Sequence, residues 1–247
     1  MDKLALTGLV LALIAIAGGF MLEGGSLSTL LHFPAFIIVL GGTLGAVMLQ
    51  TPFSQFRLGV SLLPWVFQSS RLPVKRTISR IVDWGVAARS NGFLSLEEAA
   101  LQESDPFLHR GLNLLVDGAD AAQLQATLDA QLSLERERLL RGARIFEAMG
   151  GYSPTIGIIG AVLGLIQAMA NINEPTLLGA GIATAFVATI YGVGFANLIF
   201  IPVGNKLKNL IHQQSLYHEL IIEGLVSIAQ GQNPKSIEPK LATYLPG

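Results

Sequence analysis

Few residues in this sequence have the type and spacing that catalysis or metal binding would need. The chain has 247 residues and no cysteine, which excludes disulfides, thiolate metal sites and a cysteine nucleophile. Its four histidines are scattered, at positions 32, 109, 212 and 218. No nucleophile, base and orienting group form a plausible constellation, and no GxxxxGK[ST] phosphate loop is present. We therefore expect neither an enzyme nor a chain with a bound cofactor or metal.

The composition disfavours both a soluble enzyme and a nucleic-acid-binding protein. Hydrophobic residues make up 51% of the chain and charged residues only 13%, about half of the roughly 25% that soluble domains carry. The 16 Lys and Arg are matched by 17 Asp and Glu. The chain therefore has no basic excess that would favour binding to nucleic acid phosphates.

The uncharged residues gather in four long runs, which are residues 4–22, 30–50, 150–173 and 175–205. About 20 apolar residues in a helix cross roughly 30 Å of hydrocarbon, so each run is long enough to span a membrane. The first run follows a single cation and lacks a small-residue cleavage site before a soluble domain, so we expect it to be retained.

The basic residues of the connecting segments indicate the orientation of these runs. Residues 23–29 and 172–176 contain no Lys or Arg, whereas residues 51–148 contain eleven and residues 206–247 contain four. By the positive-inside rule, both termini and the central segment lie in the cytoplasm. We predict an all-α membrane protein with four transmembrane helices in residues 1–50 and 151–205. A helical cytoplasmic domain over residues 51–150 lies between helices 2 and 3, and a cytoplasmic helical tail follows over residues 206–247.

The cytoplasmic domain begins with a clear helix signal. Pro73 is placed to open a helix with apolar residues at helical spacing, and Asn91-Gly92 would end it. The expected apolar face consists of Ile78, Ile81, Val82, Gly85 and Val86.

Further helix boundaries follow along the cytoplasmic domain. Ser95 and Glu98 have the spacing of a capping box for a short helix. Asp105-Pro106 and Asp117-Gly118 mark the limits of the next element. A long helix is then expected from Ala121 towards the membrane, and its predicted buried residues are Leu124, Leu128 and Leu132.

The four membrane runs contain no Asp, Glu, Lys or Arg. Proton relays and ion pathways inside bilayers normally need ionisable side chains. If this chain conducts ions, the titrating carboxylate must come from another chain. This chain can supply a helix surface of small and hydroxyl-bearing residues to an ion pathway, and Thr189 is one of them. The alternative is that the Thr189 hydroxyl only bonds the carbonyl four residues earlier in its own helix.

Small residues recur on one side of the third run, and they are Gly157, Gly160, Ala161 and Gly164. Gly160 and Gly164 have the small-xxx-small spacing that lets two helix backbones approach closely. These residues could pack against a partner helix or against the chain's own helices, and spacing alone favours the second. Pro154 in the third run and Pro202 in the fourth suit either a hinge or a plain helix end.

Five segments, in this order along nearly the whole chain, resemble the MotA/PomA family of bacterial flagellar stator proteins. They are VLGGTLGA at 39–46, YSPTIGIIGAVLGL at 152–165, VATIYG at 187–192, FIPV at 200–203, and the tail QGQNP at 230–234 followed by Tyr244-Leu245. The arrangement of two spans, a central segment and two further spans is also similar.

The resemblance implies a subunit of an ion channel in the bacterial inner membrane. Family members form a ring, five copies around two, that encloses the single transmembrane helices of a MotB-type peptidoglycan-binding partner. An Asp on the partner helix binds the ion, and ion flow drives torque on the rotor protein FliG. No cofactor is implied.

The resemblance also assigns roles to individual residues. Arg89 and Glu97 match the family's rotor-contacting charges, although the same two residues could simply be a solvated surface. Pro154 and Pro202 match prolines that couple ion binding to movement. On this interpretation Glu98 is the cap partner of Ser95.

The ion pathway of the family passes positions that correspond to Ala161, Ala188 and Thr189. Sodium-driven members tend to carry threonine where this chain has Ala161 and Ala188. Since a sodium ion needs several oxygen ligands and a proton needs only a carboxylate and a path, the two alanines favour H+, with Na+ as the alternative.

Two other functions are weighed against the stator. A TolQ/ExbB-type energiser, which drives a partner reaching the outer membrane, is a related ring, but it has three spans instead of four. A small-molecule transporter would be expected to show inverted repeats and broken helices with polar substrate groups, and neither is visible in the sequence.

Overall fold

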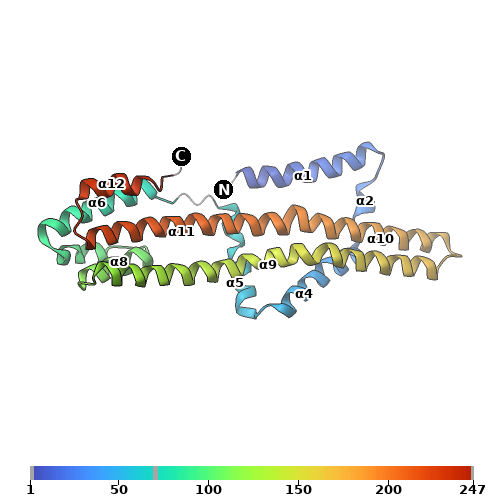
Figure 1. The fold of residues 1–247 in the computed structure, drawn as a ribbon. Helices are drawn as coiled ribbons and strands as arrows, with labels where there is room; N and C mark the ends of the chain where they lie inside the picture. Colours follow the sequence, from blue (N-terminus) through green and yellow to red (C-terminus); the bar gives the residue numbers. More distant parts are fainter. Residues whose placement is uncertain (1–2, 69–71, 246–247) are drawn as a thin grey trace. The chain divides into compact units, whose positions relative to one another are not determined.

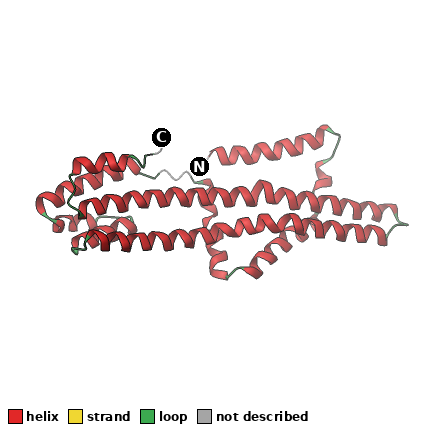
Figure 2. Ribbon diagram, viewed as in Figure 1, coloured by secondary structure: helices red, strands yellow, loops and turns green. Residues whose placement is uncertain are grey.

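The computed structural model describes residues 3–68 and 72–245, and its regular structure in these ranges is helical without strands (Figures 1 and 2). The all-α prediction is therefore confirmed. The chain divides into two compact units. Unit 1 comprises Met1–Ser69 and Leu139–Asn209, and unit 2 comprises Ser70–Arg138 and Leu210–Gly247.

Unit 1 holds the apolar helices. Its elements are α1 (Lys3–Leu22), α2 (Leu27–Leu30), α3 (Phe33–Phe36), the π-helical turn η1 (Ile37–Gly41), α4 (Gly42–Gln50), α5 (Phe53–Phe67), the C-terminal part of α9 (Ala121–Ala170), α10 (Pro175–Phe195), the π-helical turn η3 (Ala196–Phe200) and the N-terminal part of α11 (Ile201–Ala229).

Four helical stretches in the described residues are long and apolar enough to cross a membrane, which confirms the predicted number. The first two are Leu4–Leu22 and Phe33–Gln50, and the others lie within Ala121–Ala170 and Pro175–Ala229. Large apolar side chains such as Leu11 and Ile14 stay exposed along α1. Such exposure is expected where lipid, rather than water, surrounds a helix.

A small core joins the second and fourth spans within unit 1. Ala35 and Val39 from α3 and η1 pack against Val187 and Ala188 from α10, and all four residues are at most 4% exposed. Small side chains at these positions allow the helices to approach each other closely.

Neither of the two prolines in the third and fourth runs ends a helix. Pro154 lies inside the 50-residue helix α9. Pro202 is the second residue of α11, which continues directly from η3, so that helical structure runs on from Pro175 to Ala229. The interpretation as plain helix ends is therefore wrong, because helical structure continues on both sides of each proline. The hinge role stays a prediction.

Unit 2 contains the remaining helices around one apolar core. Its elements are α6 (Val74–Asn91), the 3-10 turn η2 (Phe93–Leu96), α7 (Glu97–Leu101), α8 (Pro106–Val116), the N-terminal part of α9, the C-terminal part of α11, and α12 (Pro234–Ala242), which packs beside α6 (Figure 1). The core includes the predicted Leu124, Leu128 and Leu132, of which the first two are fully buried.

The predicted limits of α6 are confirmed. Pro73 precedes the helix, and Gly92 ends it with φ +79°, a conformation that side chains with a Cβ rarely adopt. The predicted apolar face is partly wrong, since Val86 is 53% exposed. Trp84, with only 8% exposed, takes its place in the core because the buried face of α6 is centred between Ile81 and Gly85.

The predicted capping box is wrong. The hydroxyl of Ser95 donates to the carbonyl of Gly92 at 2.7 Å, within the turn η2. The Glu98 carboxylate accepts from Gln102 Nε2 at 3.1 Å. Since a 3-10 turn leads directly into α7, the cap position falls on Leu96, which has no side-chain oxygen. Asp105, by contrast, caps α8 as predicted, with its carboxylate accepting from two backbone amides.

Candidate functional site

The glycines of the third run pack against α10 of the same chain, and α9 and α10 lie side by side (Figure 1). A Cβ at Gly157 would lie 2.9 Å from the Ala188 carbonyl oxygen, and one at Gly160 would lie 2.8 Å from the Ala188 Cβ. A Cβ at Gly164 would lie 2.7 Å from the Ala185 nitrogen. Packing within the chain, the alternative that spacing favoured, is therefore confirmed.

The contact is reciprocal, because α10 carries glycines of its own. A Cβ at Gly181 would lie 2.6 Å from the Ala168 nitrogen, and one at Gly192 would lie 2.7 Å from the Ser153 carbonyl oxygen. These distances leave no room for a side chain at Gly181 or Gly192. The backbones of α9 and α10 are thus in direct contact over several turns.

The three predicted ion-pathway residues differ in their exposure. Ala188 is fully buried in the interface between α9 and α10. Ala161 is half-buried, and Thr189 is exposed on α10. The Thr189 hydroxyl donates to the carbonyl of Ala185 at 3.1 Å, which is the i−4 bond anticipated as an alternative. A threonine at position 188 would therefore place its hydroxyl inside the helix pair.

A polar network that the sequence did not reveal links the start of the second span to α10. The Tyr191 hydroxyl donates to the carbonyl of Leu30 at 2.5 Å and accepts from the backbone N–H of His32 at 3.3 Å. His32 Nδ1 accepts from the N–H of Ala35 at 3.4 Å, so Nε2 carries the proton and donates to Thr184 Oγ1 at 3.2 Å. No sequence pattern connects residues about 150 positions apart, which is why this network was missed.

One buried hydroxyl beside Pro154 lacks a hydrogen bond. Ser153 is fully buried, and its Oγ has no partner among the described residues. Most helical serines and threonines of unit 1 bond the carbonyl one turn back, as Thr43 does to Val39 at 2.6 Å. A buried hydroxyl without a hydrogen bond lowers stability, because the group has lost its contact with water and gained no partner.

The two predicted rotor-contacting residues lie on unit 2, near the junction of α6 and α7. Arg89, in the last turn of α6, and Glu97, the first residue of α7, are both exposed. Within residues 3–68 and 72–245 neither side chain forms an ion pair or a hydrogen bond. The structure therefore leaves both charges available to another molecule.

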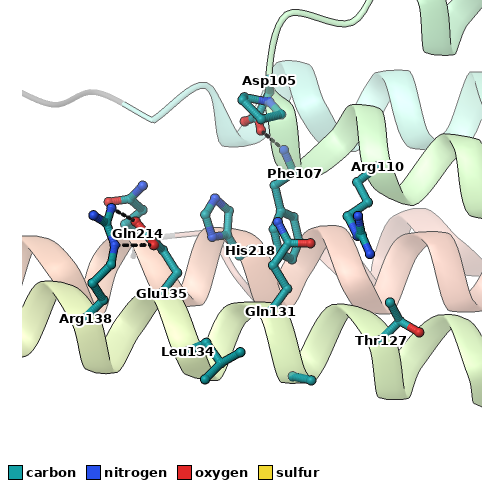
Figure 3. Close-up of a pocket in the computed structure, with 12 residues that line it drawn as sticks. Asp105, Phe107, Arg110, Thr127, Gln131, Leu134, Glu135, Arg138, Gln214 and His218 are labelled. Atoms are coloured by element: carbon teal, nitrogen blue, oxygen red, sulfur yellow. Dashed lines mark hydrogen bonds and ion pairs between the residues drawn. The ribbon is translucent and has the colours of Figure 1, made fainter.

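A hollow with a volume of about 920 Å³ lies in unit 2, between α8, α9 and α11 (Figure 3). His218 stacks on Phe107 with 4.3 Å between the ring centroids. Glu135 and Arg138 form a two-pronged hydrogen bond at its rim, at 2.7 and 2.8 Å. None of the predicted site residues lines this hollow.

Two ionisable side chains at the hollow, His218 and Glu135, have lowered pKa values. Burial lowers the pKa of His218, although the carboxylates of Asp105 and Glu135 partly oppose this effect. The hydrogen bond from Arg138 lowers the pKa of Glu135. Burial therefore favours the neutral form of the His218 imidazole.

No cluster of three or more His, Cys, Asp or Glu side chains able to hold a metal occurs in the described part of the chain. His32, His109 and His218 instead take part in contacts within the fold. His109, for example, contacts the carbonyl of Ala100 and the amide of Asn113.

Comparison with known proteins identifies two family models along the chain. Residues 99–219 match the MotA/TolQ/ExbB proton channel family, and residues 6–80 match the N-terminal region of Motility protein A. The chain is 36% identical to Motility protein A of Bacillus subtilis over 247 residues, covering all of this chain and 92% of that protein. It is 33% identical to chemotaxis protein PomA of Vibrio alginolyticus, covering 94% of each.

Two solved structures have the same fold over nearly their whole length. The C. jejuni MotAB structure matches with a TM-score of 0.94 and 31% identity, covering 100% of this chain and 96% of that one. The flagellar MotAB stator complex of Bacillus subtilis matches with a TM-score of 0.90 and 35% identity, covering 99% and 97%.

Proposed function

Since the chain belongs to the MotA/PomA family of flagellar stator proteins, within the MotA/TolQ/ExbB proton channel family, we propose that it is the ring-forming subunit of a flagellar stator. The ring encloses the single transmembrane helices of a MotB-type partner that binds peptidoglycan, in a ratio of five to two. Ion flow through this complex drives torque on the rotor protein FliG.

This proposal rests on the full-length match to MotAB structures together with the lack of charged residues in the membrane runs. The chain aligns with MotAB structures over its full length, including the N-terminal region that matches Motility protein A. Its four membrane runs nevertheless contain no Asp, Glu, Lys or Arg. An ion pathway through such helices needs a carboxylate from elsewhere, and a partner helix with an Asp would supply it.

The transported ion in this proposal is H+. The helix pair offers only one hydroxyl at the three candidate positions, that of Thr189, and this hydroxyl is already engaged with the Ala185 carbonyl. A sodium ion would need several oxygen ligands in place of its water. Swimming speed should therefore persist when sodium is removed at constant proton-motive force, and a collapse of speed would assign Na+ instead.

The first experiment is co-purification from membranes with candidate single-span partners. Recovery of a peptidoglycan-binding chain with one Asp-bearing helix would support the stator. Recovery of a partner of the TolQ/ExbB energiser type would still support an ion-driven ring, but one that drives a partner reaching the outer membrane instead of the flagellar rotor. Recovery of no partner would refute the proposal and favour a transporter, which would act as the chain alone.

The orientation that belongs to this proposal places both termini and unit 2 in the cytoplasm. The eleven Lys and Arg between residues 51 and 148 support it. Cysteines introduced singly at exposed positions of unit 2 should react with a membrane-permeant maleimide and resist an impermeant one in whole cells. We further propose that the chain catalyses no covalent reaction and binds no cofactor.

The proposed rotor contact is tested by charge reversal on α6. Arg89→Glu should abolish swimming in soft agar while leaving membrane assembly intact, since Arg89 has no partner within the described chain and charges at transient contacts set orientation and encounter rate. Arg76→Glu is the matched control, because Arg76 is also exposed on α6. Normal swimming of the Arg89 variant would contradict the assigned role.

A further inference from the structure

The side chain of His32 connects the start of the second span to α10. His32 is the N-cap of α3 and lies directly before the span Phe33–Gln50. Its Nδ1 accepts from the backbone N–H of Ala35 at 3.4 Å, and its Nε2 donates to Thr184 Oγ1 at 3.2 Å. The Thr184 hydroxyl in turn donates to the carbonyl of Ala180 at 2.9 Å. One imidazole therefore caps one helix and holds the neighbouring helix at the same time.

The two contacts of the His32 imidazole require its neutral form. The lone pair of Nδ1 accepts the Ala35 N–H, and the proton on Nε2 serves Thr184. Protonation places an N–H on Nδ1 as well, so that two donors face each other. Histidine is the side chain that ordinarily changes its charge between about pH 5 and 8. Protonation of this one side chain therefore removes the cap of α3.

The surroundings of His32 offer a positive charge no counter-ion. The elements beside it in the chain or packed against its helix are α2, α3, η1 and α10, and their sequences contain no Asp, Glu, Lys or Arg. Tyr191, which bonds the Leu30 carbonyl and the His32 backbone N–H, is the other ionisable side chain of this hydrogen-bond network. The acidic residues that flank these elements in sequence, Glu23 and Glu174, have no hydrogen bond to the network among the described residues. Protonation of His32 therefore breaks contacts without forming an ion pair.

The His32 contacts lie next to the candidate ion pathway. Thr184 and Tyr191 are about two helical turns apart, so they share one face of α10, and Ala188 lies between them on that face. Ala35, whose N–H His32 caps, belongs together with Ala188 to the small core between the second span and α10. Loss of the His32 bonds therefore loosens the packing around Ala188.

We propose that His32 is a proton-operated latch between the second span and α10. The neutral imidazole holds the two helices together, and the imidazolium releases the start of the second span. Acid on the side of the membrane that His32 faces therefore regulates the helix packing beside the ion pathway. That this side is the periplasm rests on the proposed function, whereas the latch itself depends only on the hydrogen bonds of His32.

The test is hydrogen exchange of the purified full-length chain in detergent micelles, measured by mass spectrometry on peptides that contain the Ala35 amide. Protection, corrected for the intrinsic pH dependence of exchange, should fall about fivefold between about pH 7.5 and about pH 5 in the wild type, the effect of losing one N-cap. His32→Asn should keep the same protection at both pH values, because an asparagine oxygen caps a helix and does not titrate. His32→Ala should show low protection at both.

His218→Gln is the matched control, because it removes another half-buried histidine, which lies in unit 2. It should leave the pH dependence of the Ala35 peptides intact. The His32 variants should keep wild-type protection in the peptides of α8, which shows that they are folded. Equal protection of the wild type at the two pH values, or an equal fall in His32→Asn, would overturn the latch. Failure to recover a partner from membranes would refute the proposed function and leave this exchange result unaffected.

Discussion

Replacing Gly164 by alanine should destabilise the contact between α9 and α10. The new Cβ would lie 2.7 Å from the Ala185 nitrogen and 2.7 Å from the Gly181 carbonyl oxygen, and neither backbone atom can rotate away. Ordinary contact begins at 3.4 Å, so the helices must separate by about 0.7 Å, and overpacking of this kind costs about 1–3 kcal/mol. Alanine in place of glycine returns about 0.5–1 kcal/mol of helix propensity. We expect a net loss of about 1–2 kcal/mol in the free energy of unfolding.

Gly151 provides the control for this experiment, because it lies in the same helix and a Cβ there would meet no other atom within 4 Å. Gly151→Ala should therefore raise the free energy of unfolding by about 0.5–1 kcal/mol. Both variants are compared by SDS-induced unfolding of the purified chain in detergent micelles, followed by circular dichroism. Unfolding of Gly164→Ala at the same SDS fraction as Gly151→Ala would show that the close approach of the two backbones does not limit stability.

Three further predictions concern hydrogen bonds and ionisation. Asp105→Ala removes the cap of α8 and should lower the free energy of unfolding of the chain by about 1 kcal/mol, with Asp105→Asn as the conservative control in thermal unfolding. Tyr191→Phe deletes the donor to the partly buried Leu30 carbonyl and should cost about 0.5–1.5 kcal/mol in SDS-induced unfolding, the net worth of one hydrogen bond. Burial lowers the pKa of His218 below its ordinary value of 6.5, so the unfolded chain binds more protons once the pH falls below about that value. The stability that His218 contributes is present above pH 6.5 and lost as the pH falls through the folded-state pKa, and His218→Gln should flatten this part of the pH profile of thermal unfolding. An unchanged pH profile in that variant would contradict the assignment.

Much of the fold was predictable because it depends on local patterns. The four spans follow from uncharged runs of sufficient length, and the limits of α6 and α8 follow from Pro73, Gly92 and Asp105. The buried leucines of α9 follow from their spacing of four residues. In each case the physical cause lies within a few turns of the residue concerned.

Predictions failed where two local patterns competed or where the buried face was narrow. Ser95 and Glu98 have the spacing of a capping box, but the 3-10 turn at Phe93–Leu96 places the N-cap of α7 at Leu96, one residue after Ser95. Val86 fits the apolar repeat of α6, yet it is exposed and Trp84 is buried, because the buried face of the helix is centred between Ile81 and Gly85.

The candidate site was also only partly predictable from the sequence. The glycines of the third run were found by spacing, but only the structure shows that they face α10 rather than another chain. Ala188 and Thr189 are neighbours in sequence, yet one is buried between helices and the other is exposed, because consecutive helical residues point about 100° apart. Their roles in ion flow stay predictions, as do those of Pro154 and Pro202.

The sequence by itself determined that this is a four-span helical membrane protein whose membrane runs contain no Asp, Glu, Lys or Arg, since hydrophobic length and charge are sums over contiguous residues. The tertiary structure decided which surfaces remain free. It buries the small residues of α9 in a contact with α10, joins His32 to Tyr191 across some 160 positions, and leaves Leu94 and Leu101 exposed beside two glutamates. These contacts and exposures depend on residues far apart in the chain, because close packing requires two complementary surfaces and cannot be read from either one alone.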